Sequence, residues 1–276
     1  MSNELKGQPP LREVIAKHAL KAKKSMGQHF LLDLNLTRRL VREAGDLTGI
    51  TAIEIGPGPG GLTRALFESP AKHIIAIEKD DRFIEALQPL VDSADGRLRI
   101  ISADALEIDP VTITPAPRAI LANLPYNVGT LLLVNWLHRA QEYEFFALMF
   151  QKEVAERITA TVGSKAYGRL SVLCQFCCDV EYAFTIPARA FTPPPKIDSA
   201  VVILRPKKGK YPVSIEALEA VTKDAFGQRR KMLRSIFKGK LTEEDFAKAK
   251  IKPEARAEEL SVDDFVRLTK AHPANA

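Results

Sequence analysis

The middle of the chain alternates short, almost continuous apolar runs with amphipathic stretches, and this alternation most constrains the fold. Five runs rich in β-branched residues have the length of strands: 51–55, 73–78, 98–102, 119–123 and 145–150. Runs that are apolar at nearly every position are typical of strands covered on both faces. The stretches that predict helices lie between them, at 62–68, 80–90, 128–137 and 153–160. This order indicates right-handed crossovers and an α/β fold with a doubly wound, mostly parallel sheet.

The chain continues with two weaker strand signals and a helical tail. Residues 168–178 place apolar side chains at helical spacing, and residues 180–186 and 197–204 predict two strands that join the sheet end in antiparallel fashion. Residues 214–276 show helical patterning without strand signals. We therefore predict a seven-stranded α/β domain over residues 1–206 and a small all-helical domain over residues 207–276.

A glycine-rich loop joins the first predicted strand to the following helix. Gly56, Gly58, Gly60 and Gly61 let the backbone turn sharply and let a ligand approach main-chain amides at the start of a helix. The spacing fits both G-x-G-x-G and the dinucleotide fingerprint G-x-G-x-x-G. The glycines alone therefore leave the cofactor open, and a tight turn without a ligand is the alternative.

Polar residues follow three further strands at matching places. Glu78 ends the second strand, Asp104 follows the third, and Asn123 ends the fourth. Ligands of open α/β sheets bind at the carboxyl ends of the strands, and a carboxylate at the end of the second strand can accept hydrogen bonds from ribose hydroxyls. Together with Gly56, these residues predict a nucleoside site.

The tetrad Asn123-Leu124-Pro125-Tyr126 points to the chemistry at that site. The N6 amino group of adenine is a poor nucleophile because its lone pair is delocalised into the ring. The Asn123 side-chain oxygen and the Leu124 carbonyl can accept both N6 hydrogens and favour a pyramidal nitrogen. Pro125 stiffens the turn, and Tyr126 offers a face on which an unpaired base can stack. The tetrad requires neither a metal nor a charged base, because positioning and electrostatics supply the rate.

The combined motifs resemble those of the ribosomal RNA adenine N6-dimethyltransferases, most closely the small-subunit type. The matching segments run in family order over nearly the whole chain: 27–31 (GQHFL), 54–61 (EIGPGPGG), Glu78, Asp104-Ala105, 123–126 (NLPY), 191–199 (FTPPPKIDS) and 226–234 (FGQRRKMLR). The tetrad and the Phe-x-Pro-x-Pro motif together are specific to that family, whereas the glycine loop is not.

The resemblance implies a Rossmann-like class I methyltransferase fold and S-adenosyl-L-methionine as cofactor. The implied substrate is a pair of adjacent adenosines near the 3′ end of 16S rRNA in the small ribosomal subunit, each dimethylated during subunit biogenesis. The implied cofactor-binding residues are His29, Leu31, Gly56, Gly58, Glu78, Asp104 and Asn123. Phe191 is implied to stack on the target base opposite Tyr126. Many family members have Asn where this chain has His29, and we expect a protonated imidazole there to weaken binding of a cationic sulfonium.

Basic residues are concentrated near the two ends of the chain, although the net charge is only +6. Residues 1–28 hold six basic and two acidic side chains, and residues 205–240 hold eleven basic and three acidic ones. Clustered cations favour a phosphate backbone as partner, and a solvated surface is the alternative. In the tail, Arg230, Arg234 and Lys238 have the spacing of one helix stripe, with Phe226, Leu233 and Phe237 on another face. We predict rRNA contacts for this basic segment: Arg229, Arg230, Lys231, Arg234 and Lys238.

Other features exclude function classes. No apolar stretch is long enough to span a membrane, and the first 25 residues lack a signal-peptide core, so we expect a cytoplasmic protein without a membrane partner. Cys174, Cys177 and Cys178 lie in an apolar helical segment and predict buried structural thiols, with no metal site. No obligate protein partner is evident, and a monomer is expected.

Four other functions remain as alternatives. A large-subunit rRNA dimethylase shares the tetrad, but the 226–231 segment (FGQRRK) favours the small-subunit type. DNA adenine methylases usually begin the tetrad with an acidic residue, where this chain has Asn123. A non-catalytic RNA-binding protein would not need the full set of cofactor residues. A nicotinamide dehydrogenase would need hydride-transfer residues, and none is recognisable.

Overall fold

A computed structural model describes residues 8–20, 22 and 28–272 of the chain. It divides into two compact units. The first, here called the sheet unit, holds the described residues up to 133 together with 141–155 and 181–205. The second, the helical unit, holds 134–140, 156–180 and the described residues from 206 on. The helical unit thus takes in segments before the predicted boundary at 206/207, and the division of function between the two parts stays a prediction. The predicted basic residues Lys6, Lys21, Lys23 and Lys24, and Gly27 of the 27–31 motif, lie outside the described residues.

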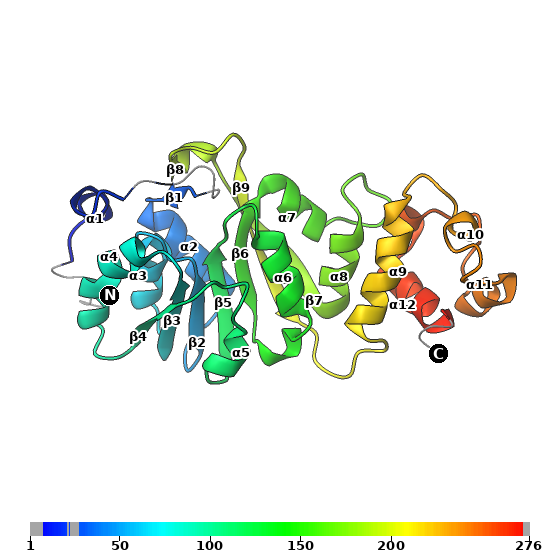
Figure 1. Cartoon of the computed structure of the whole chain (residues 1–276), viewed down its shortest axis with the longest axis horizontal. Coiled ribbons are helices and arrows are strands. Elements are labelled where there is room, and N and C mark those ends of the chain that lie inside the picture. Colours follow the sequence, from blue (N-terminus) through cyan, green and yellow to red (C-terminus); the bar gives the residue numbers. More distant parts are fainter. Residues whose placement is uncertain (1–7, 21, 23–27, 273–276) are drawn as a thin grey trace. The chain divides into compact units, whose positions relative to one another are not determined.

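The sheet unit is built on a seven-stranded sheet with helices on both faces (Figure 1). The strand order is β4-β3-β2-β5-β6-β9-β7, and the first five strands are parallel. The bounds of these five strands are Thr51–Ile55 (β2), His73–Glu78 (β3), Leu98–Ser102 (β4), Arg118–Asn123 (β5) and Phe146–Gln151 (β6). The predicted parallel α/β sheet is therefore confirmed, with strand bounds within one residue of the prediction.

The last two strands of the sheet are β7 (Cys178–Ile186) and β9 (Ser199–Pro206). β9 runs antiparallel to β6, as predicted, and β7 lies beyond it at the sheet edge. A second, two-stranded antiparallel sheet, which was not predicted, is made of β1 (Phe30–Leu31) and β8 (Phe191–Thr192). This small sheet joins the segment that precedes α2 to the segment that precedes β9.

A helix follows each of the five parallel strands along the chain. The bounds of these helices are Gly61–Phe67 (α3), Asp81–Asp92 (α4), Pro110–Ile113 (α5), Gly129–Leu137 (α6) and Lys152–Ile158 (α7). Two earlier helices were not predicted: Leu11–Lys17 (α1) and Leu34–Ala44 (α2). In α2, Asp33 caps the first turn and accepts a hydrogen bond from the Asn35 amide, while Leu40 and Val41 join the core beside β2.

The helical unit contains the predicted helical tail and one preceding helix. The bounds of its helices are Arg169–Cys177 (α8), Ile215–Gly227 (α9), Leu233–Ile236 (α10), Glu243–Ala249 (α11) and Val262–Ala271 (α12). Phe237 and Phe265 are fully buried in its core, and the Tyr167 hydroxyl donates to the Leu260 carbonyl at 2.9 Å. The predicted burial of Cys174, Cys177 and Cys178 is confirmed, and all three are free thiols.

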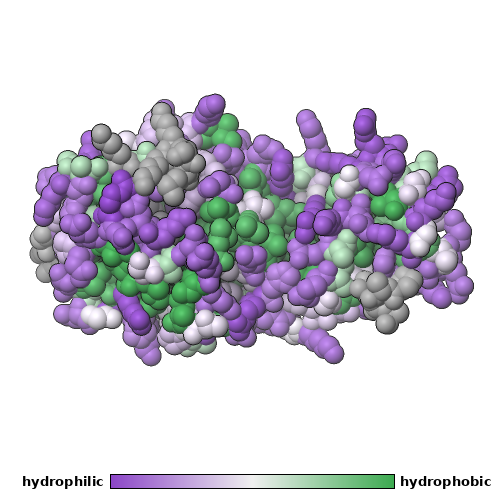
Figure 2. Space-filling view, in the orientation of Figure 1, coloured by the Kyte–Doolittle hydropathy of each residue, from purple (hydrophilic) through white to green (hydrophobic). Residues whose placement is uncertain are grey.

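The predicted single basic helix stripe is wrong. α9 ends at Gly227, residues 228–232 form a turn, and the next helix contains only Leu233–Ile236. Arg230 and Arg234 therefore belong to different elements, and Lys238 follows α10 in another turn. The inward positions of Leu233 and Phe237 are confirmed, because both are fully buried. On the face drawn in Figure 2, hydrophilic side chains predominate over α9, α10 and α11.

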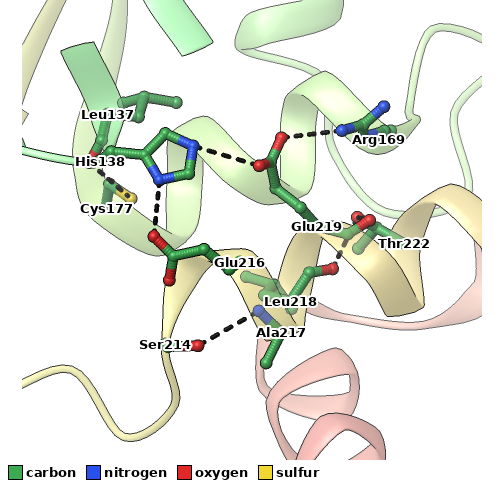
Figure 3. Close-up of polar contacts among 10 residues, drawn as sticks. All are labelled: Leu137, His138, Arg169, Cys177, Ser214, Glu216, Ala217, Leu218, Glu219 and Thr222. Carbon is green, nitrogen blue, oxygen red and sulfur yellow. Dashed lines mark hydrogen bonds and ion pairs between the residues drawn. The ribbon is translucent and has the colours of Figure 1, made fainter. Parts of the chain in front are cut away.

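A network of charged side chains joins three segments of the helical unit (Figure 3). His138 Nδ1 lies 2.9 Å from Glu216 Oε1, and His138 Nε2 lies 3.1 Å from Glu219 Oε2, both at hydrogen-bond distance. The other Glu219 oxygen accepts a hydrogen bond from Arg169 at 2.7 Å. Glu219 is the shared centre of the network because it contacts both His138 and Arg169, and its side chain is only 19% exposed, whereas that of Glu216 is 69% exposed.

Among the described residues, no helix is long and apolar enough to cross a bilayer.

The network predicts unequal effects for its two carboxylates. We expect Glu219→Ala to lower the free energy of unfolding by about 1 kcal/mol, because it leaves both His138 and Arg169 without their shared partner. Glu216→Ala, the matched control, removes a solvent-screened contact and should change stability less. Chemical denaturation monitored by circular dichroism measures the difference. Equal losses for the two variants would contradict the assignment of Glu219 as the centre.

Candidate active site

A pocket opens at the carboxyl ends of the parallel strands, and the predicted strand-end residues line it together. Gly56, Glu78, Asp104 and Asn123 all border this cavity, which has a volume of about 170 Å³. The parallel register explains the convergence: Ile55 pairs with Ile77, and Glu54 pairs with Leu121, so β2, β3 and β5 end at one edge. A cavity therefore lies at the edge where the nucleoside site is predicted, and ligand binding there stays a prediction.

The glycine loop is held in a backbone conformation that favours glycine. Gly56, Gly58 and Gly60 have φ angles of 65°, 54° and 95°. A Cβ at Gly56 would meet no atom within 4 Å, so the backbone there is open to a ligand. A Cβ at Gly61 would lie 2.5 Å from the Leu31 carbonyl oxygen, so only glycine lets the start of α3 pack against β1. The loop thus serves both the pocket and the packing beside it.

Glu78 is a buried carboxylate fixed by the backbone. It is 7% exposed and accepts hydrogen bonds from the amides of Gly58 at 3.2 Å, Lys79 at 2.9 Å and Asp80 at 3.0 Å. Burial raises the pKa of Glu78, while these amide donors oppose the rise. The hydrogen bond from the Gly58 amide joins this carboxylate to the glycine loop, so the position of Glu78 depends on the conformation of the loop.

Asp104 is a partly exposed carboxylate in the pocket lining. One of its oxygens accepts a hydrogen bond from the Leu106 amide at 2.9 Å, and the other accepts one from Lys79 Nζ at 3.0 Å. These two contacts lower the pKa of Asp104, so its carboxylate stays charged. The neighbouring Leu106 also lines the pocket and is 38% exposed, which is high for a leucine.

The Asn-Leu-Pro-Tyr tetrad follows β5 and faces the pocket. The Asn123 Nδ2 donates to the His29 carbonyl oxygen at 3.4 Å, which directs its Oδ1 away from that contact. Within the described chain, the Leu124 carbonyl accepts no hydrogen bond. The Tyr126 hydroxyl lies 2.7 Å from Ser199 Oγ, and its half-buried ring lines the pocket. Two acceptors and an aromatic face are therefore present together.

The segment from Phe191 to Pro193 contacts the pocket residue His29 through the Pro193 carbonyl. Phe191 was expected to be presented by a stiff loop opposite Tyr126, and the structure does not place it there. Its side chain is 2% exposed, packs in the core of the sheet unit, and does not line the pocket. The reason is strand pairing, since Phe191 in β8 pairs with Leu31 in β1. A stacking role for Phe191 stays a prediction and requires the ring to leave the core.

His29 and Leu31 line the pocket, where the resemblance placed them. His29 Nδ1 donates to the Pro193 carbonyl at 2.7 Å, and its ring centroid lies 5.5 Å from that of Tyr126. The same residue accepts the Asn123 amide through its carbonyl. His29 therefore connects the Pro-rich segment to the tetrad.

Glu54 is a pocket residue that the sequence analysis quoted only as part of a motif. It lines the cavity, is 1% exposed, and its Oε2 atom has no hydrogen-bond partner among the described residues. Burial raises the pKa of Glu54 to about 8, and the nearby Glu78 carboxylate acts in the same direction. The available signal was a charged residue inside the otherwise apolar strand Thr51–Ile55.

The pocket fits the implied cofactor, S-adenosyl-L-methionine, on three observations. The backbone at Gly56 is open, the Oε2 atom of Glu54 is buried without a partner, and Glu78 is a buried acceptor near the loop. A ligand with an ammonium group and ribose hydroxyls matches these acceptors. Among the described residues, no cluster of His, Cys, Asp or Glu has the geometry to hold a metal ion.

The predicted RNA-contacting residues lie in the helical unit. Arg230, Lys231, Arg234 and Lys238 are exposed. Arg229 is engaged instead, because it pairs with Glu258 at 2.6 Å and donates to the Lys165 carbonyl at 3.1 Å. Arg234 contacts Glu254 at 3.2 Å in a pair that is half exposed on both sides. RNA contact by these residues stays a prediction.

The buried Glu54 predicts a pH dependence of stability. The folded protein holds a proton on Glu54 up to pH of about 8, whereas the unfolded chain releases it near 4.5. Stability from this group is therefore present at low pH and decreases as the pH rises through this window. We expect Glu54→Gln to reduce that decrease, measured as the free energy of unfolding between pH 5 and pH 8. The exposed Glu85→Gln is the control, and an unchanged pH slope in Glu54→Gln would contradict the assignment.

The chain is similar to proteins of one known family. The sequence model of the family described as "Ribosomal RNA adenine dimethylase" matches residues 19–272. A protein of Paramagnetospirillum magneticum, named "Ribosomal RNA small subunit methyltransferase A", is 53% identical over 265 residues, covering 95% of this chain and 94% of that protein. A relative with the same name from Rhizobium etli is 52% identical over 271 residues, covering 97% of this chain and 98% of that protein.

Solved structures show the same fold. A dimethyladenosine transferase from Plasmodium falciparum has a TM-score of 0.73 and 26% identity, covering 87% of this chain and 96% of that one. The 23S rRNA methyltransferase ErmE has a TM-score of 0.69 and 24% identity, covering 88% of this chain and 99% of that one, a likeness of fold alone. The predicted Rossmann-like fold and the predicted family are confirmed: the chain belongs to the ribosomal RNA adenine dimethylase family.

Proposed function

We propose that the protein uses S-adenosyl-L-methionine to dimethylate the N6 amino groups of two adjacent adenosines near the 3′ end of 16S rRNA. It would act in the cytoplasm, as a monomer, on the small ribosomal subunit during its biogenesis. The observation that carries this proposal is the orientation of the Asn123 amide by the His29 carbonyl, inside the pocket that Gly56 and Glu78 also line. Relatives at 50–53% identity that are named small subunit methyltransferases support the small subunit over the large one.

Different residues are proposed to hold the different parts of the cofactor. The open backbone at Gly56 and the unpartnered Glu54 oxygen suit the amino-acid end, and Glu78 suits the ribose. Asp104 is proposed to contact the adenine, with His29 and Leu31 closing the same pocket. When bound, the cofactor supplies an electrophilic methyl carbon on a positively charged sulfur. The acidic lining favours that charge.

The tetrad is proposed to prepare the target amino group. Asn123 Oδ1 and the Leu124 carbonyl accept the two N6 hydrogens, which draws the nitrogen toward a pyramidal shape and directs its lone pair into the pocket. Pro125 holds the turn, since its carbonyl accepts the amides of Val128 and Gly129 at the start of α6. Tyr126, fixed by Ser199, is proposed to stack on the base. After the first methylation only one N–H remains, so one acceptor alone orients the amine for the second.

Mapping of modified nucleotides tests this function. Purified protein with labelled methyl donor and unmethylated small subunits is expected to label two adjacent adenosines near the 3′ end of 16S rRNA. We expect Asn123→Ala to lower kcat by about 100-fold, because one of the two charge-orienting contacts is lost. Asn135→Ala, an exposed amide outside the pocket, is the matched control. Labelling of 23S rRNA instead, or full activity in Asn123→Ala, would contradict the proposal.

The exposed arginines of the helical unit are proposed to position the rRNA. We expect Arg230→Ala combined with Arg234→Ala to weaken rRNA binding about tenfold at physiological salt and to reduce its salt dependence, because two phosphate contacts are lost. Cofactor affinity, measured by calorimetry, should not change. The control removes two exposed charges elsewhere in the same unit, Lys252→Ala with Lys270→Ala. Loss of cofactor binding in the folded arginine variant would contradict this division of labour.

A further inference from the structure

A second cavity lies in the sheet unit, on the other side of the glycine loop. Its volume is about 250 Å³, and residues of α1, α3, α4 and the segment before α1 line it. The two pockets share only Pro59 in their linings. Nothing in the proposed methyl transfer uses this second cavity.

Arg64 of α3 is the unusual group in its lining. The side chain is buried, with 7% of the residue exposed, and within the described chain it forms no hydrogen bond or ion pair. Burial lowers the pKa of this guanidinium, which reflects the loss of water around a charged group. Among the described residues, no Arg64 nitrogen is a fully buried atom without a partner, so the guanidinium reaches the open space of the cavity, where an anion would balance its charge. The cavity beside it is the place where such an anion fits.

Other arginines of the sheet unit show what Arg64 lacks. Arg38 forms a two-point contact with Glu68, at 2.6 and 2.8 Å. Arg82 does the same with Asp80, at 2.9 and 2.6 Å. Both of these arginines are more exposed than Arg64, and both have a carboxylate partner, which Arg64 lacks among the described residues.

The charges around the cavity favour an anion. Lys17 and His18, at the end of α1, line it together with Arg64, and Glu13 is the acidic residue in the lining. Glu13 is exposed and forms no ion pair with Arg64. A guanidinium presents parallel N–H donors that match the oxygens of a phosphate. The cavity thus offers a guanidinium donor, a basic rim and space for a group larger than a water molecule.

We propose that Arg64 is the anchor of a phosphate-binding subsite, separate from the methyl-transfer pocket. The phosphate is either a free ion or part of an RNA chain, and the chemistry of recognition is the same for both. Bound phosphate pairs the Arg64 charge and holds α1 against α3 and α4. Because Pro59 borders both pockets, the subsite lies directly behind the loop proposed to hold the cofactor.

Thermal unfolding of the full chain with inorganic phosphate tests the subsite. At constant ionic strength, we expect phosphate to raise the Tm of the wild type more than that of Arg64→Met, which keeps the aliphatic volume and removes the charge. Without phosphate, Arg64→Met should be at least as stable as the wild type, because a desolvated charge is gone. Arg12→Met, an exposed arginine of α1 outside the cavity lining, is the control and should respond as the wild type does. Equal phosphate responses in all three proteins would overturn the proposal.

Two further measurements distinguish a phosphate of the RNA backbone from a free phosphate ion. If Arg64→Met also weakens binding of a 16S rRNA fragment and inorganic phosphate competes in the wild type alone, the ligand is the RNA backbone. If only the response to free phosphate changes, the ligand is a free phosphate ion. A wild type that ignores phosphate, beside a Glu13→Gln variant that responds to it, would show that the acidic residue of the lining, and not a phosphate, balances the Arg64 charge, and would overturn the proposal. None of these measurements depends on methyl transfer.

Discussion

Parallel pairing of β2 with β3 and β5 is the constraint on which the rest of the site depends. Because these strands start and end in register, the residues that follow them meet at one edge of the sheet. Backbone contacts then fix the edge: the Gly56 amide donates to the Ile77 carbonyl at 2.9 Å, and Glu78 accepts the Gly58 amide. The pocket is therefore a consequence of sheet geometry, and its chemistry comes from four short loops.

The small β1–β8 sheet adds a second constraint, which acts on the tetrad through His29. β8 and the following Pro193 hold the segment that carries His29, and the His29 carbonyl orients the Asn123 amide. In this arrangement the segment that contains Phe191 influences the tetrad indirectly, because the Pro193 carbonyl holds His29 and the His29 carbonyl contacts Asn123. A contact between segments 94 residues apart in the sequence thus controls the direction of one side-chain oxygen.

Much of the sheet and its edge followed from local sequence signals. The runs 51–55, 73–78 and 98–102 are strands with those same bounds, because continuous apolar runs have few alternatives in a buried sheet. The signal for α2 was present as well, in the buried spacing of Thr37, Leu40, Val41 and Ala44, although it was not used. Two-residue strands such as β1 and β8 carry no periodic signal, and only their long-range pairing reveals them.

The errors have a common cause, which is that spacing alone does not fix a local conformation. Basic residues four apart predicted one helix, yet the chain leaves α9 at Gly227 and turns before α10. Motif membership predicts Phe191 at the target base, whereas in this structure its ring is buried in the core, so that role stays a prediction. Glu54 was overlooked because a motif letter does not show that a carboxylate is buried beside a cavity.

The most direct test of the account is the structure of a complex with S-adenosylhomocysteine and an RNA fragment that contains the target adenosines. The account predicts the adenine N6 atom within hydrogen-bonding distance of both Asn123 Oδ1 and the Leu124 carbonyl, with the base against Tyr126. A base bound elsewhere, or an N6 atom that faces neither acceptor, would contradict the central claim.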